Sequence, residues 1–588
     1  MPVRTSLLAL LALLTAAPAA ATPAEELHAL FAEEWRLRLS ESPLLATSVG
    51  VHTYDDRLDE VSPEAIEAAA ERRRGFLERL HRVDPAALDT QDRISYRVFE
   101  RQMEDVLSDW RFGAHQIPLN SDSGFHSSLT FLPREMPFDT SAAYERYVAR
   151  LRQVPRYFDQ QIDNLRAGLA RGMTLPREVL GGIDATIAAH VVADPAESVF
   201  HAPFESFPAT MPAAERERLA AAGAAAIRDA VVPAYAELLA FWNDEYVPGA
   251  RATLGARELP DGEAYYAHLV RRFTTLDVDA RAVHELGLAE VERIRGEMDA
   301  ILAATGFEGS YAEFLDFLRS DPRFYAETPQ DLLERAAWIA KTMDGKLPAL
   351  FATLPRLPYT VEPVPEHIAP KYTAGRYVPP PADGIRPGVY WVNTHDLASR
   401  PLFTLEALTL HEAVPGHHLQ HAIAQELADL PDFRRHSYIS AFGEGWGLYA
   451  EWLGIEAGFY QDPYSDFGRL TYEMWRACRL VVDTGLHALG WSRQRAHDYM
   501  AARTALSLHE VDTEIDRYVT WPGQALAYKM GEIEIKRLRR LAERELGPRF
   551  DVRRFHDAVL RNGSVPLPVL AEEIERFVAA EKGPSAPR

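Results

Sequence analysis

Cysteine is nearly absent from this sequence: Cys478 is the only one among 588 residues. An internal disulfide is therefore excluded, and the folded chain has to be stabilised by packing. The residues around it, MWRACRLVVD, are typical of a buried helix face, and no neighbouring pattern would activate a thiol as a nucleophile. We therefore expect Cys478 to be a core residue.

The chain also has fewer positive than negative side chains. It contains 63 Lys and Arg residues and 86 Asp and Glu residues, which gives a net charge of -23. Nucleic acids and anionic membrane surfaces bind basic faces, so neither is an expected partner. Beyond the N-terminus we find no run of about 18 apolar residues, the length that a membrane helix needs, and we expect no membrane insertion. A GxSxG motif and a regular repeat are missing too, which disfavours a serine hydrolase and a solenoid.

The N-terminus has the pattern of an export signal. MPVRTSLLALLALLTAAPAAA combines an early Arg, a Leu/Ala-rich stretch too short to span a bilayer comfortably, and a small-residue end at Ala19 to Ala21. No cysteine follows this stretch, which disfavours a lipid anchor. We expect residues 1–21 to be a signal peptide and the mature protein to be periplasmic or secreted.

Most of the remaining chain predicts helices. With 47% hydrophobic and 25% charged residues the composition is that of a globular protein. Apolar residues recur at intervals of three and four positions over residues 22–354 and again after residue 401, as in amphipathic helices. Between residues 355 and 401, ten of the 40 prolines accompany YTVEPV and GVYWVNT, which predict short strands in a small sheet or hairpin. We expect a mainly α fold in which a helical N-terminal part (22–354) and a β element plus helical catalytic part (355–588) form one continuous domain.

A histidine cluster points to chemistry. The segment HEAVPGHHLQH holds His411, His417, His418 and His421 within eleven residues, although the chain has only 20 histidines. Neutral imidazole is a common metal ligand, and catalytic zinc needs three protein ligands and an open position for water. Glu412, beside the first histidine, is the expected general base.

The spacing of this cluster is unusual. Zinc peptidases usually place two histidines at i and i+4 of one helix, but that position here is Pro415, and an unbroken helix would carry His417 about 240° round from His411. Pro415 and Gly416 together are a natural two-residue bulge, which would bring His417 to the usual place of the second ligand. We favour His411 and His417, with His418 as the competing ligand. A kinked helix with solvated histidines is the non-functional alternative.

A third ligand is expected from the following helix, SAFGEGWGLYAEWLG. Glu444 is preferred, because Gly443 and Gly445 would permit a close approach to the zinc helix. Glu451, two turns later on the same face, suits a role in orienting a ligand histidine. The alternative is that both glutamates are solvated, although the Gly, Trp and Tyr surroundings favour burial.

These segments resemble a known family, the bacterial domain of unknown function 885, with its signature HEAxPGHHLQ followed by GEGWxLYAE. The resemblance extends to GVYWVNT before the signature and to DTGLHALGWS and DRYVTWPGQALAYKMG after it. That family is similar to the gluzincin metallopeptidases, in which two histidines and a downstream glutamate hold zinc. The resemblance therefore implies a large helical gluzincin-like fold with a deep cleft, with Zn²⁺ held by His411, His417 and Glu444.

The resemblance also suggests residues around the zinc. The Arg517-Tyr518 pair is similar to a segment that supplies the oxyanion donor in angiotensin-converting-enzyme-like peptidases, so Tyr518 is the first candidate and Tyr528 the second. His487 and Arg479 are weaker candidates for substrate contacts, and Arg479 could instead pair with Asp483 one turn away. The strand GVYWVNT would lie beside the cleft and pair with an extended substrate.

The sequence thus predicts an exported zinc metallopeptidase that hydrolyses short peptides with Glu412 as general base. It does not distinguish cleavage at the amino end, at the carboxyl end or inside the peptide. The alternatives are a zinc hydrolase of another amide or ester, and a non-catalytic metal- or peptide-binding protein on the same fold. Retention of Glu412 favours an enzyme, since a pure binding site needs no base there.

Overall fold

A computed structural model describes residues 21–366, 368–380 and 386–583 of the chain. Most of these residues lie in helices, and the strands among them form one small sheet. The prediction of a mainly α fold is therefore confirmed. The predicted signal peptide lies, apart from its last residue, outside the described residues.

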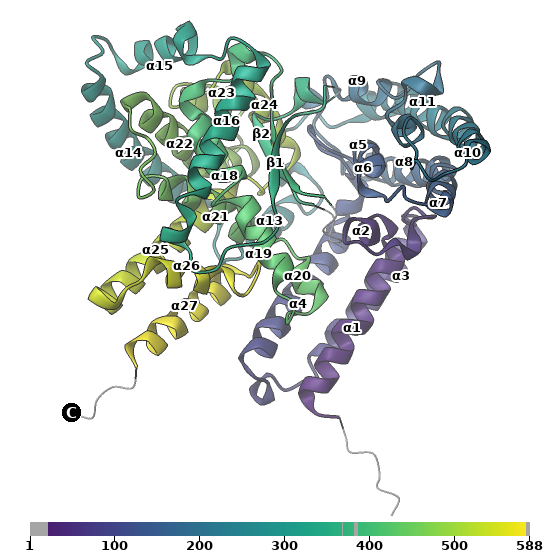
Figure 1. The fold of residues 1–588 in the computed structure, drawn as a ribbon, viewed down its shortest axis with the longest axis horizontal. Coiled ribbons are helices and arrows are strands. Elements are labelled where there is room, and N and C mark those ends of the chain that lie inside the picture. The colour runs from purple at the N-terminus through teal and green to yellow at the C-terminus, as the bar shows by residue number, and fades with distance from the viewer. Residues whose placement is uncertain (1–20, 367, 381–385, 584–588) are drawn as a thin grey trace, which may run out of the picture.

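The N-terminal part contains two groups of helices, drawn in purple and blue in Figure 1. The first group holds α1 (Pro23–Glu41), α3 (Pro63–Leu80) and α4 (Thr90–Phe112), and the second holds α7 (Ser141–Leu151), α8 (Val154–Arg171), α10 (Ala213–Ala226) and α11 (Val232–Phe241). Helices α1, α3 and α4 begin at Thr22, Ser62 and Asp89, whose side chains accept backbone N–H bonds of the first turn.

One helical run in this part is apolar enough to cross a membrane by length and composition. It extends over Ala213–Gly249, and its most apolar window has a mean hydropathy of 1.2, with 44% of that window buried inside the molecule. Leu219, Tyr235 and Phe241 of this run belong to the core of the second helix group. Core helices of soluble proteins pass the same test, and these contacts account for the apolar side chains.

The sheet has three strands, β1 (Tyr359–Pro363), β2 (Gly375–Val378) and β3 (Gly388–Val392). Their order is β1-β3-β2, with β3 parallel to β1 and antiparallel to β2. The two predicted strands are confirmed as β1 and β3, while β2 was not predicted. Because β3 is paired on both sides, GVYWVNT cannot pair with a substrate as we expected. Strand β2 is an edge strand, and it lines a cavity that the histidine cluster also lines.

The C-terminal part, residues 355–588, is built around a buried helix, α22 (Pro463–His487). Helix α14 (Ala280–Thr305), from the N-terminal part, packs along it and joins the two parts. Cys478 lies on α22 and is fully buried. Burial raises the pKa of its thiol to about 12. The expectation of a core thiol is therefore confirmed.

Helices α21 (Ser440–Leu453) and α25 (Leu526–Leu546) pack so closely that their backbones are in contact where they cross. A Cβ atom on Gly445 would lie 2.5 Å from the Cα of Gly531, and a Cβ on Gly531 would lie 1.9 Å from the carbonyl oxygen of Ala441. Both glycines are needed for this close crossing, since any side chain would force the helices apart. The sequence predicts that Gly445 contacts the helix of the histidine cluster, but in the structure it faces α25. The glycine against His411 is Gly447, where a Cβ would lie 2.6 Å from the imidazole.

A buried carboxyl group on α22, that of Asp483, makes the stability of the fold depend on pH. Asp483 accepts hydrogen bonds from the Tyr266 hydroxyl at 2.5 Å and the Gly523 N–H at 3.0 Å. Burial raises its pKa from 3.8 to about 7, although these bonds and Arg479 act in the opposite direction. Between these two pH values the folded chain binds a proton that the unfolded chain does not, so the free energy of unfolding falls as the pH rises.

Asp483→Asn is expected to remove this loss of stability. From pH 5 to pH 8 the wild type should lose about 2 to 4 kcal/mol relative to the variant, because one pKa unit corresponds to about 1.4 kcal/mol. Urea unfolding of both proteins at several pH values measures the difference. Parallel pH profiles for the two proteins would contradict the assignment.

Candidate metal centre and active site

Two consecutive helices, α18 (Leu405–Glu412) and α19 (His417–Glu426), carry the histidine cluster, and residues 413–416 separate them. The predicted interruption at Pro415 and Gly416 is therefore a full break between helices, wider than a two-residue bulge. A Cβ atom on Gly416 would lie 1.9 Å from the His411 carbonyl oxygen, so only glycine fits there. The Trp446 indole N–H donates to the Pro415 carbonyl at 2.8 Å and holds the break in place.

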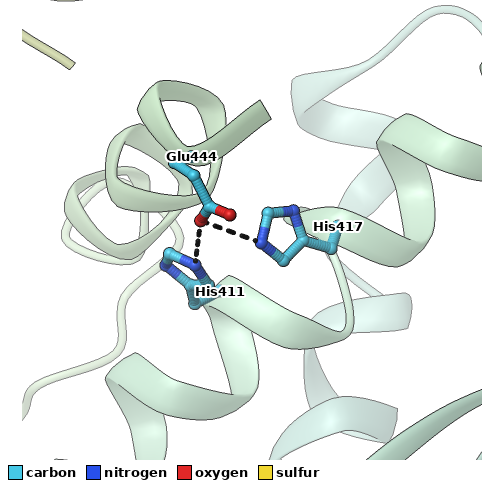
Figure 2. A group of neighbouring side chains, drawn as sticks. All are labelled: His411, His417 and Glu444. Carbon is cyan, nitrogen blue, oxygen red and sulfur yellow. Dashed lines mark ion pairs between the residues drawn. The ribbon is translucent and has the colours of Figure 1, made fainter. Parts of the chain in front are cut away.

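The break brings His411, His417 and Glu444 together, as Figure 2 shows. One carboxylate oxygen of Glu444 lies 3.5 Å from Nε2 of His411 and 3.3 Å from Nε2 of His417. Zinc bonds of about 2.0 to 2.2 Å in a tetrahedron place the ligand atoms about 3.4 Å apart. The spacing and the donor types of this group therefore fit a zinc ion.

Buried neighbours orient two of the three candidate ligands. Nδ1 of His411 lies 2.7 Å from a Glu451 oxygen, and Arg476 contacts the same oxygen at 3.3 Å. This leaves Nε2 of His411 directed to the cluster, the arrangement in which a carboxylate fixes a metal-binding histidine. The Tyr438 hydroxyl donates to the other oxygen of Glu444 at 2.7 Å.

The charges of the group also favour a cation. Burial would lower the pKa of His411, but Glu444 and Glu451 outweigh it and raise the pKa to about 10. Burial would raise the pKa of Glu444, but His417 and His411 outweigh it and hold the pKa well below its ordinary value. Glu444 is therefore a buried, ionised carboxylate, and positive charge beside it, on a histidine or on a bound cation, stabilises it.

His418 faces away from this group. Its Nδ1 lies 3.1 Å from the Tyr377 hydroxyl, and its Nε2 lies 3.0 Å from the Leu357 carbonyl. Burial lowers its pKa to about 4. Both ring nitrogens are thus occupied by other partners, and the histidine that meets Glu444 is His417. His421 lines the cavity and stacks on Tyr438, with ring centroids 5.5 Å apart.

Glu412 lies beside the ligands on the wall of a cavity of about 400 Å³. One of its carboxylate oxygens accepts the backbone N–H of Tyr377, in strand β2, at 2.7 Å. The small sheet thus fixes the proposed base relative to the ligand helix. His411, His417 and Glu444 line the same cavity, so a water held between them and Glu412 would be open to a substrate.

Two predicted residues lie outside the cavity lining. The Tyr518 hydroxyl accepts bonds from Trp475 at 2.8 Å and Arg479 at 2.7 Å, and donates to Glu514 at 2.5 Å. All of its hydrogen-bonding capacity is used within the core, so Tyr518 is not positioned as the oxyanion donor. His487 is fully buried, and both of its ring nitrogens are hydrogen-bonded to the backbone, one to the Ala256 N–H and the other to the Tyr518 carbonyl. It is therefore a structural residue rather than a substrate contact.

Tyr528, the second candidate, does line the cavity. Its ring stacks on His411, with centroids 6.4 Å apart and planes 21° from parallel. Its hydroxyl accepts a hydrogen bond from Arg517 at 3.2 Å. The hydroxyl proton is therefore available to an acceptor in the cavity.

Arginines in the cavity wall were mostly missed by the sequence interpretation. Arg479, predicted as a substrate contact, does line the cavity, and it binds Glu514 at 2.8 Å rather than Asp483. Arg376, Arg476 and Arg517 line it as well. A signal existed on α22, where the cavity-lining residues Tyr472, Trp475, Arg476 and Arg479 recur at helical spacing.

Glu451→Gln is expected to weaken zinc binding about 10- to 100-fold, because the amide removes the charge that orients and polarises His411. Competition with a chelating dye measures the affinity. Glu456→Gln, which removes a carboxylate paired with Arg539 nearer the surface, is the matched control and should leave the affinity unchanged. Equal affinities of the two variants would contradict the role of Glu451.

Comparisons with known proteins agree on the fold. No match is found among curated proteins. A solved structure described as "the putative lipoprotein from Colwellia psychrerythraea" is 28% identical, with a TM-score of 0.88 over 95% of this chain and 100% of that one. A "putative lipoprotein of unknown function from Shewanella oneidensis" is 19% identical, with a TM-score of 0.68 over 94% and 99% of the two chains, and shares the fold. Residues 43–574 match the family described as "Bacterial protein of unknown function (DUF885)", and the chain belongs to that family.

Proposed function

We propose that this protein is an exported zinc metallopeptidase of gluzincin type that hydrolyses short peptides. The observation that carries the proposal is the spacing of His411 and His417 from one Glu444 oxygen, 3.5 and 3.3 Å, which fits the edges of a zinc tetrahedron. Glu412 stands on the same cavity wall, where a site that only binds metal would need no base.

A zinc ion bound by these residues would supply Lewis-acid polarisation of the carbonyl and would lower the pKa of the attacking water. Glu412 takes the proton from the water and passes it to the leaving amine. The Tyr377 N–H holds the Glu412 carboxylate in place during both transfers. Tyr528 donates a hydrogen bond from its hydroxyl to the oxyanion, the role that the sequence predicts for Tyr518.

The shape of the cavity favours binding of a peptide in an extended conformation. Strand β2 runs along its wall and is an edge strand, so it replaces β3 as the strand that pairs with a substrate backbone. A second cavity of about 480 Å³, between the N-terminal and catalytic parts, shares Ser123 and Trp521 with the first. Two adjoining cavities of this size admit a few residues of peptide and exclude a folded protein.

Export is supported by the N-terminal pattern of residues 1–21. The similar protein from Colwellia psychrerythraea is described as a putative lipoprotein, which is a class of exported protein.

The test is a peptide-library digestion by the purified protein, followed by mass spectrometry, with metal content measured on the same sample. We expect about one zinc per chain, cleavage of short peptides, loss of cleavage with a chelator and recovery on adding zinc. Ester and non-peptide amide substrates are included in the same assay. A zinc-loaded protein that cleaves only these, or cleaves nothing, would overturn the peptidase proposal.

A further inference from the structure

The cavity wall is rich in positive charge, although the chain as a whole has a net charge of -23. Arg376, Arg476, Arg479 and Arg517 all line it. The last three are nearly buried, with exposed fractions of 4%, 1% and 8%. Buried arginines are rare unless carboxylates pair with them or a ligand does.

Protein carboxylates do not balance this group. Glu514 binds both Arg479, at 2.8 Å, and Arg517, at 3.3 Å. Arg376 pairs with Asp122 at 3.3 Å. Three arginines thus share two carboxylates, and one positive charge is left over. Arg476 is not part of this excess, because it pairs with Glu451.

Hydrogen bonds of the arginines are also incomplete. Nη1 of Arg479 and Nε of Arg517 are buried and have no partner among the described residues. Leaving a buried charged donor unpaired is costly, and buried polar groups in proteins nearly always have a partner. These two nitrogens are closed off from the cavity, but other atoms of both arginines line it, and an anionic ligand there would supply the missing charge.

These arginines lie close to the proposed reaction site. The Tyr528 ring stacks on His411, and the Arg479 guanidinium lies 4.2 Å from the centroid of the same ring. Arg517 donates to the Tyr528 hydroxyl. One aromatic ring therefore lies between the Arg479 guanidinium and the proposed metal ligand His411. The two are at most about 11 Å apart, a span that a peptide covers in about three residues at about 3.5 Å each.

We infer that Arg479 and Arg517 bind a carboxylate of the substrate, within about three residues of the scissile bond. The carboxylate is either the free carboxyl terminus of the peptide or an acidic side chain. Guanidinium is suited to either, because its planar N–H pairs match a carboxylate. The inference rests on the proposed function and narrows it to peptides that carry a negative charge on one side of the cleaved bond.

The test measures binding without turnover. Zinc-loaded Glu412→Gln protein is titrated by calorimetry with three tripeptides: Ala-Ala-Ala, its carboxyl-terminal amide, and the amide of Ala-Glu-Ala. We expect at least one of the two peptides with a carboxylate to bind about 10- to 100-fold more tightly than the neutral amide. The tighter of the two identifies the source of the carboxylate.

Variants assign the effect to the arginines. Arg517→Gln and Arg479→Gln in the same background are expected to bring the charged and neutral peptides to similar affinity. Arg335→Gln, which removes an arginine that is paired with Asp331 on a solvent-exposed helix, is the control and should keep the preference. The peptide comparison in the Glu412→Gln protein needs no arginine variant, so equal affinities there overturn the subsite even if a buried substitution prevents folding. A preference that persists in both arginine variants overturns it as well.

The outcomes separate this inference from the peptidase proposal. Equal binding of all three peptides, or no binding, overturns the carboxylate subsite, even if the wild type cleaves peptides. A carboxylate preference that depends on Arg479 or Arg517 supports the subsite, even if the wild type cleaves none of them.

Discussion

His417→Ala is expected to purify without zinc, whereas His418→Ala should retain about one zinc per chain. The two residues are neighbours in the sequence, but only the His417 imidazole lies 3.3 Å from the Glu444 oxygen. Losing one of three protein ligands leaves the ion with too few donors for a stable tetrahedral site. Metal analysis after extensive desalting measures the difference, and peptide cleavage should follow the metal content.

Stability provides the control for this pair. His418 bonds to Tyr377 and to the Leu357 carbonyl, so its removal should lower the free energy of unfolding by about 1 to 3 kcal/mol without removing zinc. Urea unfolding in the presence of zinc measures this cost. Zinc retained by His417→Ala and lost from His418→Ala would reverse the ligand assignment.

Glu412→Gln is expected to retain zinc and to lower the rate of peptide cleavage about 100- to 10,000-fold, the usual contribution of a general base. The amide keeps the size of the side chain and can still accept the Tyr377 N–H, but it cannot take a proton. Steady-state cleavage of the best library peptide measures the rate, and metal analysis confirms the loading.

A second carboxylate on the same helix is the matched control. Glu406 accepts bonds from the Tyr460 N–H and the Ser465 hydroxyl and does not line the cavity. Glu406→Gln should therefore leave the cleavage rate close to that of the wild type. A fully active Glu412→Gln protein would show that another group is the base, and loss of zinc from it would show that Glu412 is a ligand.

The sequence was most informative where function depends on local spacing. His411, Glu412 and His417 lie within one short segment, and the chain can bring them together by breaking a single helix at Pro415 and Gly416. Glu444 follows in the next long helix, so few arrangements are available. The helical character and two of the three strands were also predictable, because both depend on short-range periodicity.

The errors concern residues whose surroundings depend on distant segments. Tyr518 and Tyr528 lie on different helices, and whether each faces the cavity is decided by packing against α22. Tyr518 lies against Trp475 and Arg479 in the core, whereas Tyr528 lies against His411. Likewise, no property of GVYWVNT reveals that strands pair on both of its sides.

The arginine group is a different kind of omission. The spacing of Arg476 and Arg479 on α22 was available in the sequence, but an Arg on an amphipathic helix is usually solvated. That these arginines are buried together follows only from the folded structure. The two carboxylates that pair with Arg376, Arg479 and Arg517 belong to Asp122 and Glu514, which are far apart in the chain.

The close crossing of α21 and α25 at two glycines fixes how precisely the residues of the site are placed relative to one another. Glu444 lies on one of these helices and Tyr528 on the other. The contact between Gly445 and Gly531 therefore sets the backbone distance between the proposed metal ligand and the proposed oxyanion donor. Main-chain atoms define that distance, and rotamer changes of intervening side chains cannot alter it. The site is thereby preorganised, and its geometry is already in place before a substrate arrives.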